Sequence, residues 1–192
     1  MYEVRIHGRG GQGAVTAAEL LSIAAFEAGH WAQAFPSFGS ERTGAPVAAF
    51  CRIDDRPIRL REPIQHPDAL LVLDPSLLTN PDVYAGLVPD GVILVNAARP
   101  VDELGLDTVL TAHPGVRVRT VPATDIARRL IGRPLPNAVM LGGFAALTHR
   151  VSIDGVAKAL RERFPGPLGE GNAAGATEAY DAVFTAEVKS CA

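Results

Sequence analysis

The stretch His7-Gly8-Arg9-Gly10-Gly11-Gln12-Gly13-Ala14 is a glycine-dense turn between two regular segments. Before it, residues 2–6 alternate charged and apolar side chains, which predicts a strand. After it, residues 14–28 place apolar side chains at helical spacing, and Gly29 follows as a C-terminal cap. Four glycines in six residues permit left-handed backbone angles and a close approach to a bulky group. We therefore expect a strand–loop–helix unit on which the rest of the fold is built.

This glycine loop also has the character of an anion site. The unpaired N–H groups at the start of the predicted helix face the loop, and this end of a helix carries roughly half a positive charge. Gly8-x-Gly10-x-x-Gly13 fits the dinucleotide fingerprint, which also expects an acidic residue about 20 positions further on, at the end of a second strand. The second apolar segment, 31–35, instead runs into Pro36-Ser37, and the nearest acid is Glu41. The loop thus favours a polyanion or a partner's cofactor over NAD, and a turn without a ligand is the alternative.

Size and composition describe one globular domain spanning residues 1–192. Apolar residues make up 47% of the chain and charged residues 20%. The net charge of −3 gives no electrostatic case for nucleic acid, and we expect no membrane span because no apolar run is long enough. The start of the chain suggests no signal peptide. Cys51 and Cys191 form no CxxC, which is typical of a buried thiol and a tail thiol in a reducing cytoplasm.

The rest of the chain alternates strand-like and helix-like segments. Strands are expected at 47–53, 69–73, 91–96 and 116–121, with a short strand at 57–60 that forms a hairpin with 47–53. Helices are expected at 76–87, 124–130, from 137 onward, 152–164 and 172–188. This order predicts the α/β class, as a single three-layer α/β/α domain with a mixed, mainly parallel sheet.

Polar residues follow several of these strands. Ligands of open α/β sheets bind beyond the C-terminal ends of the parallel strands. We therefore expect the glycine loop, the turn after Phe35, Asp74 and Asn96 to lie along one rim. For Asp74 and Asn96, capping of a helix or turn is the alternative.

Motifs for bond-breaking chemistry are missing from the sequence. The five histidines have no metal-ligand spacing, and only His7, beside the glycine loop, is kept as a possible contact. There is no G-x-S-x-G elbow, and Ala14 stands where a Walker loop needs lysine. The Gly-Asp-Gly of thiamine-diphosphate sites is also absent, because Pro89 precedes Asp90-Gly91. An anion loop without catalytic or metal residues is typical of a subunit.

Several segments of this sequence resemble those of a known family. Gly8–Gly13, residues 17–21 (Ala-Ala-Glu-Leu-Leu) and residues 33–47 are similar to the gamma subunit of 2-oxoacid:acceptor oxidoreductases, of the pyruvate:ferredoxin (pyruvate synthase) type. The resemblance continues through 55–59, 73–78, 95–96, 136–142 and 168–172, and covers essentially the whole chain. One departure is Arg42-Thr43-Gly44, where the family often has a second arginine in place of Thr43.

The resemblance implies a multi-subunit enzyme that oxidatively decarboxylates a 2-oxoacid to an acyl-coenzyme A and CO2. Pyruvate is the favoured substrate, with branched-chain or aryl 2-oxoacids as competitors. Coenzyme A is then a co-substrate at a shared site, while thiamine diphosphate, Mg²⁺ and [4Fe-4S] clusters belong to partner subunits of the alpha, beta and delta types. The electron acceptor is ferredoxin or a flavoprotein. This chain is expected to be cytoplasmic and inactive alone.

The predicted site lines the coenzyme A channel or abuts the thiamine site. Arg9, Glu41 and Arg42 are its expected polar contacts, since guanidinium groups bind phosphate oxygens well. An ion pair or a subunit contact is the alternative for Glu41-Arg42. For the whole chain, the alternatives are a scaffold subunit without ligand contact and an independent NAD-binding dehydrogenase. The predicted site residues are Gly8, Arg9, Gly10, Gly11, Gln12, Gly13, Ser37, Gly39, Glu41, Arg42 and Asn96.

Overall fold

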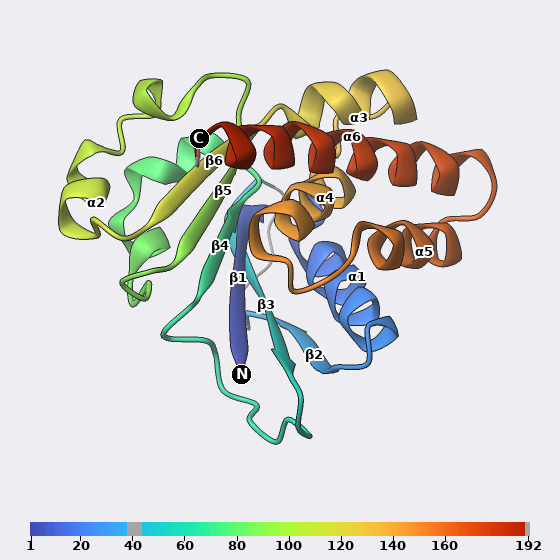
Figure 1. The fold of residues 1–192 in the computed structure, drawn as a ribbon, viewed down its shortest axis with the longest axis horizontal. Helices are drawn as coiled ribbons and strands as arrows, with labels where there is room; N and C mark the ends of the chain where they lie inside the picture. Colours follow the sequence, from blue (N-terminus) through green and yellow to red (C-terminus); the bar gives the residue numbers. More distant parts are fainter. Residues whose placement is uncertain (38–43, 191–192) are drawn as a thin grey trace.

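A mixed sheet forms the centre of the molecule (Figure 1). The computed structural model describes residues 1–37 and 44–190, and within these residues six strands pair in the order β2-β3-β1-β4-β5-β6. The strands are β1 (Tyr2–Arg9), β2 (Trp31–Pro36), β3 (Pro46–Asp54), β4 (Ala69–Val72), β5 (Val92–Asn96) and β6 (Arg117–Val121).

Strand directions divide the sheet into two parts. β1, β4, β5 and β6 run parallel, whereas β3 is antiparallel to both β1 and β2. The mixed, mainly parallel sheet is therefore confirmed. The predicted hairpin is wrong, because residues 57–60 form no strand. Both edges of β3 are already taken by β1 and β2, so no free edge remains for a partner from the following segment.

The two faces of the sheet are covered unequally. One face carries α1 (Ala14–Glu27), α3 (Ala123–Ile131), α4 (Asn137–Thr148), α5 (Ile153–Arg163) and α6 (Pro167–Ser190). The other face, over β4 to β6, carries the short α2 (Asp107–Ala112) and three 3₁₀ helices, η1 (Pro75–Thr79), η2 (Pro81–Tyr84) and η3 (Val101–Glu103). The three-layer prediction is confirmed, with one layer much thinner than the other (Figure 1).

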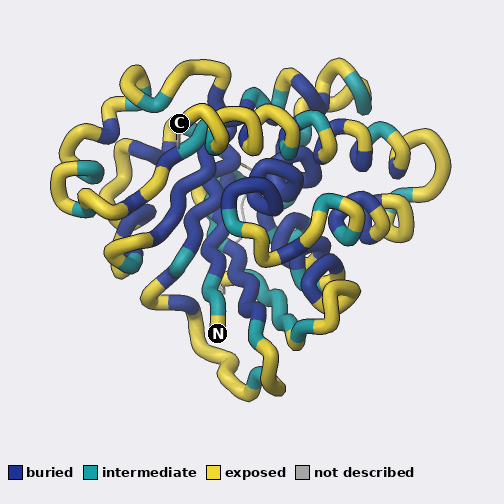
Figure 2. The backbone as a smooth tube through the Cα atoms, viewed as in Figure 1, coloured by how far each residue is buried: buried dark blue, intermediate teal, exposed yellow. Residues whose placement is uncertain are grey.

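The buried centre explains two sequence patterns. β4 and β5 are buried along their full length because both their faces are covered, and they therefore read as continuous apolar runs (Figure 2). α4 is buried over residues 137–147 because it lies between the sheet and α6. Its Gly142 faces the backbone of α6 so closely that a β-carbon there would lie 1.8 Å from the carbonyl oxygen of Ala176.

The segment 76–87 differs from the prediction. Instead of one helix it forms η1 and η2, which are separated at Asn80. Pro81 has no N–H and begins the second turn, while the Asp74 and Asn80 side chains each cap a 3₁₀ helix. The other predicted helices are confirmed, although α6 begins at Pro167 instead of 172, and α2 was not anticipated.

Candidate functional site

The predicted rim is present. β1, β2, β4 and β5 run in the same direction and end at one edge of the sheet, which brings Arg9, Ser37, Asp74 and Asn96 to that edge. The antiparallel β3 begins there as well, because Pro46 is the register partner of Arg9. Loops from four strand ends and one strand start therefore border the site.

The glycine loop leads into α1 and packs against the first residue of α4. Gly11 and Gly13 have φ angles of 97° and 79°, in the left-handed region that favours glycine. A β-carbon at Gly13 would lie 2.4 Å from Nδ2 of Asn137, the first residue of α4. Gly10 also exchanges backbone hydrogen bonds with the end of residues 37–45, which we call the second motif: its N–H donates to the Ala45 carbonyl (2.9 Å) and its carbonyl accepts from Gly44 N–H (3.1 Å).

Arg9 and Gln12 take part in a network with Asp74. Gln12 Oε1 accepts from the backbone N–H of Arg9 (2.8 Å), and its Nε2 donates to Asp74 Oδ2 (3.0 Å). Arg9 Nε lies 3.2 Å from the same oxygen, while its two terminal nitrogens donate to Gly44 carbonyl (3.1 Å) and Ser76 Oγ (2.8 Å). Every nitrogen of the Arg9 guanidinium thus has an internal partner, and the group joins β1, the second motif and η1.

Asp74 is held in its charged form by this network. Burial raises the pKa of Asp74, but hydrogen bonds from Ser76 and Gln12 and the charge of Arg9 outweigh burial, so the pKa lies below its usual range. The carboxylate is therefore a fixed anchor for Arg9 at neutral pH.

Asn96 is engaged within the protein. Its Nδ2 donates to the carbonyl of Leu73 and to Oγ1 of Thr124, both at 2.8 Å, and its Oδ1 accepts from Thr124 N–H at 3.0 Å. The side chain is buried. It ties the ends of β4 and β5 to the start of α3, as the capping alternative expects.

The second motif is described only at its ends. Ser37 is exposed, and its backbone N–H donates to the carbonyl of Ala48. Gly39, Glu41 and Arg42 lie outside the described residues, as does Thr43.

A pocket beside the glycine loop adds residues that the sequence reasoning missed. We call it the loop pocket; its volume is about 270 Å³, and the first turns of α1, α4 and α6 contribute to its wall. The remaining wall comes from the end of α3, the α3–α4 connection and the end of α5. The lining residues are Gly11, Gly13, Thr16, Ile131, Arg133, Leu135, Asn137, Arg163, Phe164, Leu168 and Asn172.

The charged groups of the loop pocket are both cationic. Arg133 and Arg163 are exposed, and within the described part of the chain neither has a carboxylate at salt-bridge distance. The guanidinium of Arg163 lies over the ring of Phe164, 5.6 Å from its centre. The first turns of three helices add partial positive charge at the same place, so the pocket suits a multiply charged anion.

His7 lies on the strand that leads into the loop, and it serves the packing of the thin layer. Its Nε2 accepts a hydrogen bond from Arg5 Nε (3.0 Å), and Arg5 also donates to the carbonyls of Val83 and Ala85. Burial, together with the Arg5 charge, lowers the pKa of His7 to about 4. The imidazole is therefore neutral and structural.

The described residues include neither a membrane-spanning helix nor a metal-binding cluster. Across residues 1–37 and 44–190, no helix is long and apolar enough to span a bilayer. In the same part of the chain, no three His, Cys, Asp or Glu residues are grouped so as to bind a metal ion. Cys51 is a free, buried thiol whose pKa is raised by burial.

Comparisons with known proteins agree on one family. A family model described as pyruvate ferredoxin/flavodoxin oxidoreductase matches residues 3–182. The chain is 51% identical over 183 residues to pyruvate synthase subunit PorC of Methanothermobacter thermautotrophicus, covering 95% of this chain and 96% of that protein. It is 48% identical over 188 residues to the common gamma subunit of pyruvate/ketoisovalerate oxidoreductases of Thermococcus kodakarensis, covering 98% and 100%.

A solved structure shares the fold. Pyruvate oxidoreductase subunit PORC of Thermotoga maritima matches with a TM-score of 0.80 and 36% sequence identity, over 94% of this chain and 95% of that one. The family model and both relatives extend over nearly all of the chain, from the glycine loop to α6. The chain therefore belongs to the pyruvate ferredoxin/flavodoxin oxidoreductase family, as a gamma-type subunit of a multi-subunit 2-oxoacid oxidoreductase.

Proposed function

We propose that this chain holds the phosphate-bearing part of coenzyme A in the loop pocket, within an enzyme that converts pyruvate or a related 2-oxoacid to an acyl-coenzyme A and CO2. Thiamine diphosphate, Mg²⁺ and [4Fe-4S] clusters are carried by alpha-, beta- and delta-type partners, which pass electrons to ferredoxin or a flavoprotein. The chain alone is inactive.

The observation that carries this proposal is the convergence of cationic groups at the loop pocket. Coenzyme A has a pyrophosphate and a 3′-phosphate, so its recognition requires several donors directed at phosphate oxygens. Arg133 and Arg163 have no carboxylate partner among the described residues, and residues of the first turns of α1, α4 and α6, where helices carry partial positive charge, line the same wall. The apolar side chains of Leu135, Phe164 and Leu168 provide surface for the rest of the ligand.

Arg9 has a different part in this proposal. Because its three guanidinium nitrogens bond Asp74, Gly44 and Ser76, it acts as a positioning residue that fixes the glycine loop against the second motif. Gly11 and Gly13 let the backbone approach the ligand without an intervening side chain. The chain thus binds and orients the nucleotide end, while the thiol end reaches the partner subunits, where the bonds are made and broken.

Steady-state kinetics of the assembled enzyme test this proposal. Arg133→Ala and Arg163→Ala should each raise the KM for coenzyme A about 10-fold, since a charge-assisted hydrogen bond to phosphate contributes roughly 1.5 kcal/mol. The KM for the 2-oxoacid should not change. Arg9→Ala should also raise the KM for coenzyme A, through displacement of the loop. Arg61→Ala, an exposed arginine in the connection between β3 and β4 at the opposite edge of the sheet, is the control. An unchanged KM for coenzyme A in both pocket variants, with assembly intact, would support the scaffold alternative instead.

An independent NAD-binding dehydrogenase is disfavoured by the strand order. In the dinucleotide fold, the strand beside β1 is parallel and ends in the carboxylate that binds the ribose. Here the neighbour of β1 on that side is the antiparallel β3, and β2 ends in Pro36-Ser37. Turnover of any substrate with NAD by the purified chain alone would contradict this assignment.

A further inference from the structure

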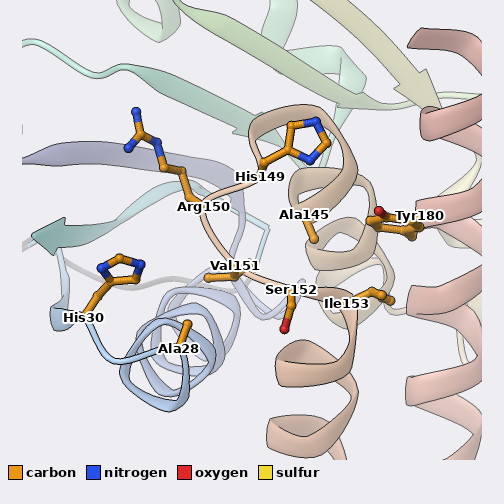
Figure 3. A pocket seen from close by; sticks show the side chains of 9 residues that line it. All are labelled: Ala28, His30, Ala145, His149, Arg150, Val151, Ser152, Ile153 and Tyr180. Carbon is orange, nitrogen blue, oxygen red and sulfur yellow. The ribbon is translucent and has the colours of Figure 1, made fainter. Parts of the chain in front are cut away.

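A groove at the opposite edge of the sheet is not used by the proposed function. It lies where α1 ends and β2 begins, whereas the loop pocket lies where α1 starts. The groove has a volume of about 370 Å³, and we call it the amino-edge groove. Its lining residues are Ala28, His30, Ala145, His149, Arg150, Val151, Ser152, Ile153 and Tyr180 (Figure 3).

One arginine and two histidines line the groove. They are Arg150, His30 and His149, and no carboxylate is among the lining residues. Within the described residues, Arg150 has the ring of Tyr2 as its partner, 4.4 Å from the ring centre, and the His149 side chain has no hydrogen-bond partner. His30 Nδ1 is 2.8 Å from Asp55. A basic groove on a chain with a net charge of −3 is complementary to an acidic partner.

The floor and one wall of the groove are apolar. Figure 3 shows Arg150 and His30 on one side of the groove and Tyr180 of α6 on the other, with Val151 and Ala145 between them. The apolar surface continues beyond the groove along α6, because the Phe184 ring stacks on Tyr180 with centres 5.7 Å apart. Phe184 is 44% exposed and Val188, four residues further on, is 55% exposed. Tyr180, Phe184 and Val188 thus form one stripe at helical spacing, which we call the α6 stripe.

His149, which lines the groove, has a left-handed backbone conformation that most non-glycine residues avoid. Its φ is 54°, and it is the one non-glycine residue with positive φ among those described. The left-handed C-cap of α4 turns the chain so that the next three residues, 150–152, form the groove wall.

We propose that the amino-edge groove and the α6 stripe dock a segment of a partner subunit in which carboxylates lie beside apolar side chains. The family is multi-subunit, so partner chains are at hand. Arg150 and the His149 imidazole match the carboxylates, and the stripe matches the apolar side chains. Large exposed aromatic residues beside arginine are typical of the centres of protein interfaces. A small free anion would leave the α6 stripe uncovered.

Reconstitution of the complex tests this docking. The chain is titrated into a purified complex of the remaining subunits, and the dissociation constant is measured by light scattering or sedimentation. Arg150→Glu and Phe184→Glu should each weaken assembly about 10-fold or more. Because Phe184 is exposed at the surface of α6, its variant keeps the test valid if Arg150→Glu does not fold. Thermal melting of each free variant verifies folding.

Matched controls separate the groove from general surface effects. Arg99→Glu and Leu60→Glu make the same kinds of change at exposed positions elsewhere, and should assemble like the wild type. Higher salt should weaken wild-type assembly, and weaken Arg150→Glu assembly less. Wild-type assembly by both groove variants, or equal losses in the controls, would overturn the proposal.

A photocrosslinker at position 184 of the assembled complex identifies the occupant. The proposal predicts a cross-link to a partner segment that contains aspartate or glutamate beside apolar residues. A cross-link to a basic segment, or none at all, would contradict it. Binding of inorganic phosphate in the groove, with assembly unaffected by either variant, would show an anion site and would refute docking. Because this surface is remote from the loop pocket, neither outcome decides whether coenzyme A binds in the loop pocket.

Discussion

Asn96 shows at the scale of a single residue how a polar side chain after a strand serves the fold. Its amide makes three internal hydrogen bonds, to Leu73 and Thr124. Asn96→Ala should leave buried partners unsatisfied and lower the free energy of unfolding by about 2 kcal/mol or more. Urea denaturation measures the loss, and Asn80→Ala, which removes an exposed cap, should cost less. A stable Asn96→Ala variant with a raised KM for coenzyme A would instead assign this residue to the ligand.

His7 should make stability depend on pH. Burial and the charge of Arg5 lower its pKa in the folded chain to about 4, against about 6.5 in the unfolded chain. As pH falls from 6.5 toward 4, the unfolded state binds a proton that the folded state does not, so stability is lost in that window. At pH 5 the loss from this group is about 2 kcal/mol.

A comparison with His7→Gln isolates this effect. Glutamine offers an acceptor to Arg5 without a titrating ring, so the difference in unfolding free energy between pH 7 and pH 5 should shrink by about that amount. Equal pH dependence in the two proteins would show that the protonation of His7 is not coupled to folding.

The residues at the rim differ in how well the sequence predicts them. Arg9, Gln12 and Asp74 were placed at one edge because each follows a predicted strand, and the structure brings them together. Arg133 and Arg163 could not be predicted in this way, because Arg133 follows α3 and Arg163 ends α5, and helix packing brings both to the loop. The segments that resemble the family, 136–142 and 168–172, include Asn137 and Asn172 of the same pocket but neither arginine.

At the scale of elements, the contact between α4 and α6 depends on one glycine. Gly142→Ala would place a β-carbon 1.8 Å from the carbonyl oxygen of Ala176, and should destabilise the protein by about 3 kcal/mol despite the better helix propensity of alanine. Gly143→Ala meets Leu94 at 3.0 Å and should cost much less, since a side chain end can move. Thermal or urea unfolding of the two variants measures both losses of stability. Equal losses would mean that close packing of α4 against α6 at Gly142 does not limit the size of that side chain.

The C-cap of α4 provides a second test. The left-handed backbone angles of His149 cost about 1 kcal/mol, and glycine adopts the same angles without this strain. His149→Gly should therefore raise the free energy of unfolding by about 0.5–1 kcal/mol. If the groove docks an acidic segment, the same variant should also assemble less tightly. A destabilised His149→Gly would show that the imidazole contributes packing that outweighs the backbone strain.

Among the elements, long apolar patterns were predicted well and local pairings were not. The strands β4 and β5 follow from apolar runs, and α5 follows from the Ser152 cap and an apolar period. The hairpin at 57–60 failed because hydrogen bonding between strands distant in sequence decided the neighbours of β3. The helix at 76–87 failed because Pro81 and two capping side chains favour short 3₁₀ turns.

On the scale of the whole molecule, the two edges of the sheet have separate roles in this account. The rim with the glycine loop and the loop pocket faces an anionic ligand, and the amino-edge groove faces a partner. α1 runs from one to the other, starting at Ala14 beside the loop and ending at Glu27 beside the groove. The chain would then be held at one edge while the other contributes to a site shared with neighbouring subunits.

The decisive measurement is a calorimetric titration of coenzyme A into the assembled complex. The double variant Arg133→Ala/Arg163→Ala should bind coenzyme A about 100-fold more weakly than the wild type, because two charge-assisted contacts contribute about 3 kcal/mol. An unchanged dissociation constant in the intact double-variant complex would contradict the assignment of the loop pocket to coenzyme A.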